Sequence, residues 1–269
     1  MAEPILKVEQ LRKVFGPRRG RPAVVAVDEV SFMVPPGGSL AIVGESGSGK
    51  STVARMLLAL ETPTSGRICV AGHERDRRRL STAERRQRAR NLQIVFQNPY
   101  TSLDPRQLVG HCLDEALRLH SGHDRRTRQE RVFQLLNQVG LDERHARSVP
   151  GELSSGQCQR VAIARALAPE PRILVLDEPV SALDVSIQGQ ILNMLSDIRT
   201  ETGVSYVFIS HDLAVVRQVT DDLIVMRKGQ VLEAGRTARI LDAPRHPYTQ
   251  LLRASVPRPG WTPRRVGKH

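Results

Sequence analysis

Aromatic side chains are scarce in this sequence: Phe, Trp and Tyr together make up only 3% of its 269 residues. Aliphatic side chains must therefore fill most of the core. Hydrophobic residues reach 40%, which is enough to build one and excludes a chain that is disordered throughout. No run of about 18 apolar residues exists, so no bilayer-spanning segment is expected. The first ten residues, MAEPILKVEQ, lack a basic region followed by an apolar stretch, so no secretory signal is expected either.

Cysteine is also rare. Cys69, Cys112 and Cys158 are scattered, with no C-x-x-C pair among them. This spacing argues against a disulfide framework, a zinc ribbon or an iron–sulfur site. It predicts free thiols in a reducing cytosol.

Positive charge is in excess, with a formal net charge of +12 at pH 7. Such an excess fits nucleic acid, an anionic membrane surface or nucleotide phosphates as a partner, and it equally fits an Arg-rich proteome. The Arg-rich segments 75–90 and 125–131 are interpreted as solvated faces. Because they lack the interleaved aromatics of single-strand binding platforms, no specific nucleic-acid partner is expected.

Strands and helices alternate along the chain, which predicts an α/β fold with a helical insertion at about residues 98–165. Gly140 is expected to end a helix inside that region, and Ser81 with Glu84 forms a capping-box pattern. The last stretch, 243–269, is Pro-rich and basic and is interpreted as a C-terminal extension. Strands are predicted at 5–9, 30–34, 39–43, 67–70, 92–96, 173–176 and 204–210, helices at 50–60, 156–168, 186–200 and 212–219, and a hairpin at 223–235.

The strongest motif is G-x-x-x-x-G-K-[ST] at residues 44–51, between a predicted strand and a predicted helix. Its glycines let the backbone wrap closely around phosphates, and the N–H groups at the start of the helix attract them. Lys50 is expected to reach the β- and γ-phosphates, and the Ser51 hydroxyl to bind Mg²⁺. The residues expected to surround the phosphates are Gly44, Glu45, Ser46, Gly47, Ser48, Gly49, Lys50, Ser51 and Thr52.

A second motif, ILVLDEP, places Asp177 and Glu178 at the end of an apolar strand. By itself such an acidic pair is often no more than two solvated carboxylates. Together with the phosphate loop it predicts that Asp177 holds Mg²⁺ through a water molecule and that Glu178 polarises the attacking water. The two motifs together indicate a P-loop NTPase, and the lack of an N-K-x-D motif argues against a GTPase.

The segment LSSGQ at residues 153–157 indicates which kind of P-loop NTPase this is, because it resembles the LSGGQ signature of the ATP-binding cassette (ABC) ATPases. Other marks of that family follow in their usual order: Gln97 after a strand, the segment 181–184 (SALD), and His211 after a late strand. The resemblance covers nearly the whole chain. It implies a central, mostly parallel sheet with N-terminal antiparallel β elements and a helical subdomain. The implied divisions are a RecA-like core at 1–97 and 166–242, a helical subdomain at 98–165 and an extension at 243–269.

Two further segments are similar to one subfamily, which energises the import of dipeptides, oligopeptides and nickel. They are VFQNPYTSLDPR at residues 95–106 and HPYTQLL at 246–252, the latter followed by SVP at 255–257. The HPYT segment is fairly specific to that group.

The family resemblance also implies how ATP is bound. Two nucleotide-binding domains face each other head to tail, and ATP lies between the phosphate loop of one and the signature of the other. Ser154 and the backbone of Gly156 are expected to contact the γ-phosphate in trans, with Ser155 and Gln157 beside them. Phe15 stands where the family keeps an aromatic residue that stacks on adenine.

For hydrolysis, the resemblance implies that Glu178 is the general base and that His211 contacts the γ-phosphate and orients the water. Gln97 would sense Mg²⁺ and the water, and would pass that state to membrane subunits. Asp184 would couple one site to the other across the dimer. The predicted metal-site residues are Ser51, Gln97 and Asp177.

Three of these residues have plainer interpretations. Gln97 could be an ordinary surface residue, His211 could cap the helix that follows it, and Phe15 could pack in the core. Ser155 departs from the family pattern, which has glycine there, and its Cβ would weaken the site if a positive φ were required. Cys158 also departs from the pattern, and no redox role is expected for it.

The leading prediction is an ATPase subunit that powers an ABC importer for peptides or similar small solutes, nickel included. The implied partners are a second, non-identical ATPase subunit, two integral-membrane permease subunits and an extracytoplasmic solute-binding protein. The expected location is the cytoplasmic face of the membrane. The alternatives are a soluble ABC ATPase that acts on nucleic acid or ribosomes, suggested by the +12 charge, and a P-loop small-molecule kinase. The sequence does not distinguish peptides, nickel and other small solutes as the transported cargo, since specificity in this family lies in other subunits.

Overall fold

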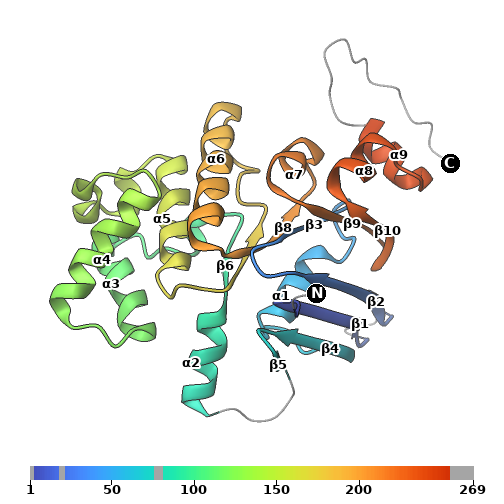
Figure 1. Cartoon of the computed structure of the whole chain (residues 1–269), viewed down its shortest axis with the longest axis horizontal. Helices are drawn as coiled ribbons and strands as arrows, with labels where there is room; N and C mark the ends of the chain where they lie inside the picture. Colours follow the sequence, from blue (N-terminus) through green and yellow to red (C-terminus); the bar gives the residue numbers. More distant parts are fainter. Residues whose placement is uncertain (1–2, 18–21, 76–80, 255–269) are drawn as a thin grey trace.

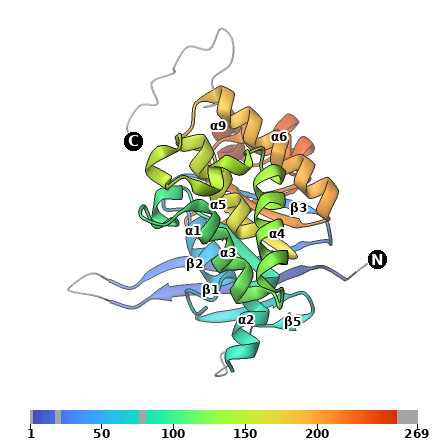
Figure 2. The same ribbon diagram turned by 90° about the vertical axis from the view of Figure 1, so that its left-hand side faces the viewer.

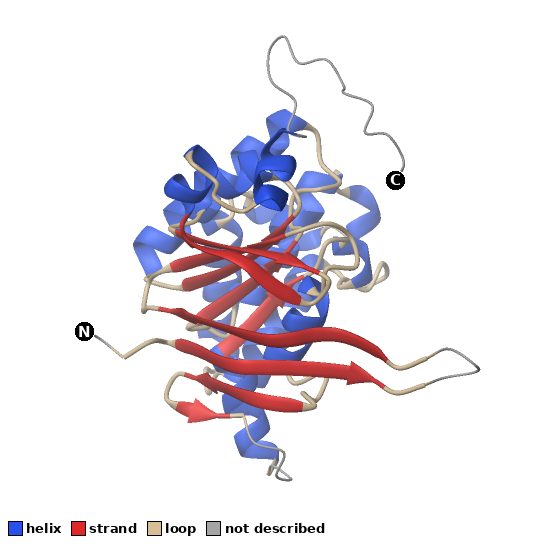
Figure 3. Ribbon diagram, turned by 90° about the vertical axis from the view of Figure 1, so that its right-hand side faces the viewer, coloured by secondary structure: helices blue, strands red, loops and turns tan. Residues whose placement is uncertain are grey.

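The computed structural model describes residues 3–17, 22–75 and 81–254 (Figure 1). Two sheets form the centre of this part of the chain. One is antiparallel, in the order β2-β1-β4-β5, and the other has the order β10-β9-β3-β8-β7-β6. Figure 3 shows them as two separate sets of strands, with the antiparallel sheet the lower one. The strands are β1 Leu6–Phe15, β2 Val24–Val34, β3 Ser39–Val43, β4 Ser65–Val70, β5 His73–Glu74, β6 Leu92–Val95, β7 Ile173–Asp177, β8 Ser205–Ser210, β9 Asp222–Arg227 and β10 Gln230–Arg236.

The six-stranded sheet is parallel from β6 to β9, and only β10 runs antiparallel to its neighbour. Its central strands are continuous apolar runs because both faces of the sheet are covered. Along β7, Leu174 and Leu176 pack on one face, and Ile173 and Val175 pack on the other. The predicted mostly parallel central sheet with N-terminal antiparallel strands is confirmed.

Helices cover the two faces of this sheet differently. Helix α1 packs between the two sheets, while α3 to α6 build a separate apolar core against the opposite face. Figure 2 shows α3, α4 and α5 gathered on that side of the molecule. The helices are α1 Lys50–Leu57, α2 Thr82–Asn91, α3 Val109–His120, α4 Arg125–Gln138, α5 Ser155–Leu167, α6 Val185–Thr202, α7 Leu213–Val219, α8 Thr237–Asp242 and α9 Pro247–Ala254, with 3₁₀ turns η1 Pro99–Thr101, η2 Glu143–Arg147 and η3 Pro150–Glu152.

Several local signals act as the sequence predicts. Ser81 and Glu84 form the reciprocal capping box at the start of α2, and Gly140 takes a φ of 69° just after α4. Helix α1 ends earlier than predicted, at Leu57, because Ala59 adopts a φ of 57° and the N–H of Leu60 turns back to the carbonyl of Arg55. None of the described helices combines the length and the apolar character that crossing a membrane requires.

The N-terminal hairpin is much longer than the predicted strands 5–9 and 30–34. Its pairing runs from Leu6 opposite Val34 to Phe15 opposite Val24, with register shifts on the way. Each shift resets the alternation of inward and outward side chains, so no single period-2 pattern marks these strands. Residues 18–21, which lie between the two predicted strands, are outside the described residues. The predicted C-terminal segment, 243–269, contains helix α9, and its residues 255–269 also lie outside the described part.

The buried hydroxyl of Tyr206 offers a test of this packing. It donates a hydrogen bond of 2.8 Å to the carbonyl of Leu195 in α6, and the side chain is almost fully buried. Tyr206→Phe removes that bond and keeps the ring, so we expect the free energy of unfolding to fall by about 1 kcal/mol. Urea denaturation measures it. An unchanged midpoint would show that the bond does not contribute to joining α6 to β8.

Candidate nucleotide-binding and hydrolysis site

The phosphate loop runs from the buried strand β3 to helix α1, and close contacts require glycine at two of its positions, 44 and 49. Gly44 has a φ of 154°, and a Cβ on it would lie 2.2 Å from the carbonyl oxygen of Met226. Gly49 has a φ of 107°, and a Cβ there would lie 2.4 Å from the carbonyl oxygen of Ala26. Both residues are therefore restricted to glycine, and the loop is wrapped tightly between β2 and β9.

Helix α1 presents unbonded N–H groups at this loop. Gly49 stands at its N-cap and has no side chain to accept a hydrogen bond from the first turn. Such free N–H groups and the helix dipole favour an anion. The Ser51 hydroxyl is exposed beside them, and Thr52 is half-buried. The arrangement suits a phosphate group.

Lys50 is the cation of this loop and is buried within it. Its Nζ donates to the carbonyls of Gly44, at 2.7 Å, and Glu45, at 2.8 Å. Burial lowers the pKa of Lys50, while the negative charges of Glu178 and Asp177 act in the opposite direction. An ammonium group held by neutral carbonyls beside two carboxylates is suited to exchange those carbonyls for phosphate oxygens.

Asp177 lies at the end of β7, in surroundings that disfavour its negative charge. Burial raises its pKa, and the neighbouring Glu178 raises it further, while Lys50 lowers it. A divalent cation would relieve this charge. The Ser51 hydroxyl, the Asp177 carboxylate and the Gln97 amide supply only oxygen ligands, which Mg²⁺ prefers, so these residues fit that ion.

Glu178 follows β7 and is held by residues that follow the two neighbouring strands. Gln97 follows β6 and donates its amide to Glu178 Oε2 at 3.1 Å, while His211 follows β8 and places Nδ1 3.1 Å from Glu178 Oε1. Since these strands are parallel neighbours, their carboxyl ends meet at one edge of the sheet. The backbone of Glu178 has a φ of 50°, fixed in part by its N–H bond to the carbonyl of Ile209. Three residues predicted separately from the sequence therefore form one cluster.

The plainer interpretation of His211 does not hold, because Asp212 caps helix α7. Its Oδ1 accepts the N–H groups of Ala214, at 2.8 Å, and Val215, at 3.4 Å. The imidazole of His211 remains directed at Glu178.

Ser181 is a site residue that the sequence did not single out. Its hydroxyl accepts from the Gln97 amide at 3.2 Å and donates to the carbonyl of Glu178 at 3.1 Å. Ser181 therefore connects the side-chain amide of Gln97 to the backbone of Glu178. The segment 181–184 contained it, but nothing in that segment indicates a contact with residue 97, which lies far away in the sequence.

The signature segment forms the start of helix α5 on the exposed surface. Ser154 and Gln157 make a reciprocal capping box, with Ser154 Oγ 3.2 Å from the N–H of Gln157. Ser155 is the first residue of the helix and is not among the described residues with positive φ, so its Cβ causes no backbone strain. Gly156 has no room for a side chain, since a Cβ would lie 2.7 Å from Ile187.

The signature and the phosphate loop of this chain are apart. Helix α5 packs on one face of the six-stranded sheet and α1 on the other. Within residues 3–17, 22–75 and 81–254, no hydrogen bond or ion pair joins 153–157 to 44–52. One chain therefore does not bring the two elements onto the same ligand.

The two remaining predicted residues are exposed. Phe15 is 39% exposed at the end of β1, where Lys13 Nζ lies 4.9 Å from its ring centroid. It is no fully buried core residue. Asp184 stands at the N-cap position of α6 without a side-chain capping bond, and Val185 after it is 84% exposed. Cys158, by contrast, is buried, and burial raises the pKa of its thiol, which makes it a poor redox centre.

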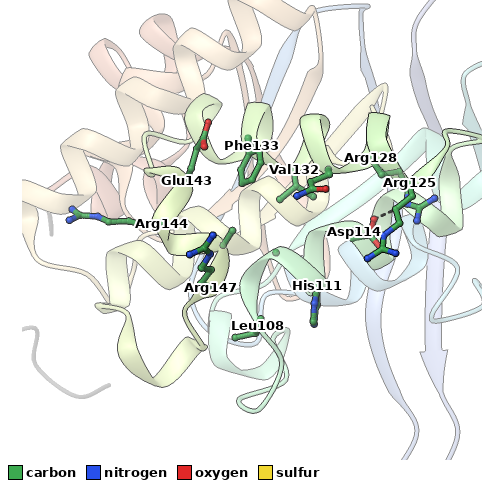
Figure 4. A pocket seen from close by; sticks show the side chains of 13 residues that line it. Leu108, His111, Asp114, Arg125, Arg128, Val132, Phe133, Glu143, Arg144 and Arg147 are labelled. Carbon is green, nitrogen blue, oxygen red and sulfur yellow. Dashed lines mark hydrogen bonds and ion pairs between the residues drawn. The ribbon is translucent and has the colours of Figure 1, made fainter.

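A cavity of about 720 Å³ lies away from these residues, between α3, α4 and η2, with Val132 and Phe133 in its wall and four arginines around it (Figure 4). None of the predicted site residues lines it. A second hollow of about 490 Å³ does include Gln97, together with Ser155 and Leu183. That hollow connects the hydrolysis cluster to the signature surface.

Comparison with known proteins agrees with this geometry. Residues 27–181 match the family described as ABC transporter, and residues 232–268 match the region described as oligopeptide/dipeptide transporter, C-terminal region. The chain is 48% identical over 239 residues to the Di/tripeptide transport ATP-binding protein DppF of Pseudomonas aeruginosa (strain UCBPP-PA14), covering 89% of this chain and 73% of the relative. It is 43% identical over 262 residues to the Dipeptide transport ATP-binding protein DppF of Escherichia coli (strain K12), covering 96% and 78%.

The fold has solved counterparts. A dimeric post-hydrolysis structure of the ATP-binding cassette MJ0796, bound to ADP and Pi, superposes with a TM-score of 0.76 at 29% identity, covering 86% of this chain and 98% of that one. With the family match spanning more than half of the sequence, the chain belongs to the ABC transporter family.

Proposed function

We propose that this chain binds Mg²⁺-ATP at residues 44–52 and hydrolyses it with Glu178, and that it thereby powers the import of peptides or similar small solutes. The observation that carries this proposal is the convergence of Gln97, Glu178 and His211 at the strand edge that also carries the phosphate loop. Both named relatives are peptide transport proteins, which favours transport over the alternative of an ATPase that acts on nucleic acid or ribosomes.

Positioning and charge account for most of the chemistry. The free N–H groups of the loop and of α1 bind the phosphates, and the Lys50 ammonium leaves its carbonyl partners to contact the β- and γ-oxygens. Ser51 would hold Mg²⁺ directly and Asp177 through a water molecule, with Gln97 beside them. Bound there, the ion would neutralise negative charge on the phosphates.

Glu178 accepts the proton of the attacking water as the general base. Gln97 and His211 hold its two carboxylate oxygens, so the carboxylate is oriented before ATP arrives. His211 stays at the γ-phosphate end and orients the water. Gln97 lines the 490 Å³ hollow, where a change in its contacts would be exposed to a partner.

A second subunit completes the site. Because the signature lies on the other face of the sheet and points to solvent, Ser154, Ser155 and the backbone of Gly156 serve the ATP bound by a partner cassette. Asp184, Val185 and Gln157 lie on exposed or half-buried surface near this contact, and Phe15 offers a ring for adenine. Binding of ATP closes the pair, and hydrolysis opens it.

The remaining partners follow from the transport role. They are a second, non-identical ATPase subunit, two integral-membrane permease subunits and, at one remove, an extracytoplasmic solute-binding protein. The chain would act at the cytoplasmic face of the membrane, with residues 98–165 as the helical subdomain, 1–97 with 166–242 as the ATP-binding core and 243–269 as the C-terminal segment.

Glu178→Gln tests the general base. The amide cannot take up the proton, so we expect ATP turnover of the assembled complex to fall at least about a hundredfold while ATP binding is kept. Glu130→Gln, which removes an exposed carboxylate on α4, is the matched control and should turn over ATP normally. Wild-type turnover in Glu178→Gln would remove the residue from this role.

Lys50→Ala tests the nucleotide as the agent of closure. Without the ammonium group the triphosphate is held weakly, so ATP should no longer bring two cassettes together. Cross-linking or size-exclusion chromatography with Mg²⁺-ATP measures closure, and Lys7→Ala, at an exposed lysine, is the control. Persistent closure in Lys50→Ala would contradict the sandwich arrangement.

Ser155→Gly restores the residue usual in the family. Since Ser155 already adopts the helical backbone, we expect turnover to stay at the wild-type level and the free energy of unfolding to fall by at most about 1 kcal/mol. Turnover of the complex and urea denaturation measure the two effects. A severalfold gain in turnover would show that the serine side chain hinders the site.

A further inference from the structure

The phosphate loop is contacted from outside by the C-terminal helix α9. The hydroxyl of Tyr248 accepts a hydrogen bond from the backbone N–H of Glu45 at 3.2 Å, and Tyr248 is only 3% exposed. Glu45 lies in the segment that matches the ABC transporter family, and Tyr248 in the segment that matches the C-terminal region. The bond therefore joins two parts of the chain that the sequence matches separately.

The residues around Tyr248 fix the start of α9 on strand β10. Glu233 accepts the N–H of Arg245 at 2.9 Å with one carboxylate oxygen and the N–H of His246 at 3.2 Å with the other. Burial alone would raise the pKa of Glu233, but the N–H group of Arg245, together with contacts to Thr249 and His246, brings it below its ordinary value. His246 Nδ1 then accepts the N–H of Tyr248 at 3.1 Å, and Pro247 has no N–H to satisfy.

The tyrosine ring is held as well. The guanidinium of Arg227, at the end of β9, lies 4.6 Å from its centroid, which is a cation–π distance. The ring is thus placed by β9 and the backbone by β10. The hydroxyl has little freedom to leave Glu45.

The bond acts on one particular peptide group. Its carbonyl, from Gly44, accepts from Lys50 Nζ at 2.7 Å inside the loop, and its N–H, from Glu45, donates to Tyr248 outside the loop. Because a trans peptide is planar, the two bonds together fix its orientation. The loop has one more outside support, since the N–H of Gly229 donates to the carbonyl of Ser48 at 3.0 Å.

We propose that Tyr248 is a positioning residue for ATP binding, which keeps the Gly44–Glu45 peptide in place when Lys50 turns from the Gly44 carbonyl to the phosphates. The inference rests on the proposed ATP site at residues 44–52. With the hydroxyl present, the N–H groups that follow Glu45 stay directed at the triphosphate. Without the hydroxyl, the peptide loses Tyr248 and Lys50 as hydrogen-bond partners at once. ATP binding must then also order the loop, which makes the free energy of binding less favourable.

The experiment compares two hydroxyl deletions in the full chain. Tyr248→Phe keeps the ring and removes the bond to Glu45. Tyr206→Phe is the matched control, because it removes one buried hydroxyl that also bonds to a backbone group, on the α6 side of the sheet. Calorimetry with Mg²⁺-ATP measures the dissociation constant, and thermal unfolding without nucleotide gives Tm. Lys50→Ala is measured in parallel.

We expect Tyr248→Phe to raise the dissociation constant for ATP by about fivefold, the effect of one neutral hydrogen bond, with a drop in Tm no larger than that of Tyr206→Phe. Tyr206→Phe should bind ATP like the wild type. Wild-type affinity for ATP in Tyr248→Phe, or an equal loss of affinity in Tyr248→Phe and Tyr206→Phe, would overturn the inference. If Lys50→Ala still fails to bind ATP in that case, the proposed site stands. Wild-type affinity in Lys50→Ala would overturn the proposed site and the inference together.

Discussion

A loop that binds phosphate must keep N–H groups free on its inner side, and so its outer side has to be held by other parts of the molecule. Here that constraint determines which residues can lie next to the loop. Gly44 and Gly49 have no Cβ because the carbonyls of Met226 and Ala26 occupy the space, and Gly229 bonds to the carbonyl of Ser48. The strands β2 and β9 and the β9–β10 turn are therefore part of the nucleotide site, although none of their residues carries a motif.

The parallel sheet provides the second half of the site by its topology alone. Strands β6, β7 and β8 are adjacent, so the residues that follow them meet at one edge, whatever their separation in the sequence. A carboxylate there would be solvated and mobile if it stood alone. Gln97 and His211 each contact one of the oxygens of Glu178, and in the proposed hydrolysis this preorganisation would reduce the reorganisation needed in the transition state.

Features that depend on local sequence could be predicted, and features that depend on long-range contacts could not. The apolar strands β3, β7 and β8, the glycine loop and the capping box at Ser81 all have signals within a few neighbouring residues. The strands of the hairpin β1–β2 were predicted too short because its register shifts interrupt the alternation of apolar and polar residues. The roles of Ser181 and Tyr248 were missed for another reason. Each makes its decisive contact with a residue more than 80 positions away, at Gln97 and Glu45, and a single sequence does not record such pairs.

The placement of the signature gives a physical reason for the partner cassette that the proposed function requires. Helix α5 and helix α1 each present an N-terminus suited to a phosphate group, but the six-stranded sheet separates them within one chain. In the proposed function, a second cassette brings the other N-terminus to the same γ-phosphate, whose charge holds the two proteins together until hydrolysis removes it. Hydrolysis would thereby be converted into movement of whole subunits. Gln97 lines the hollow beside Ser155, where the proposal has it sense both events.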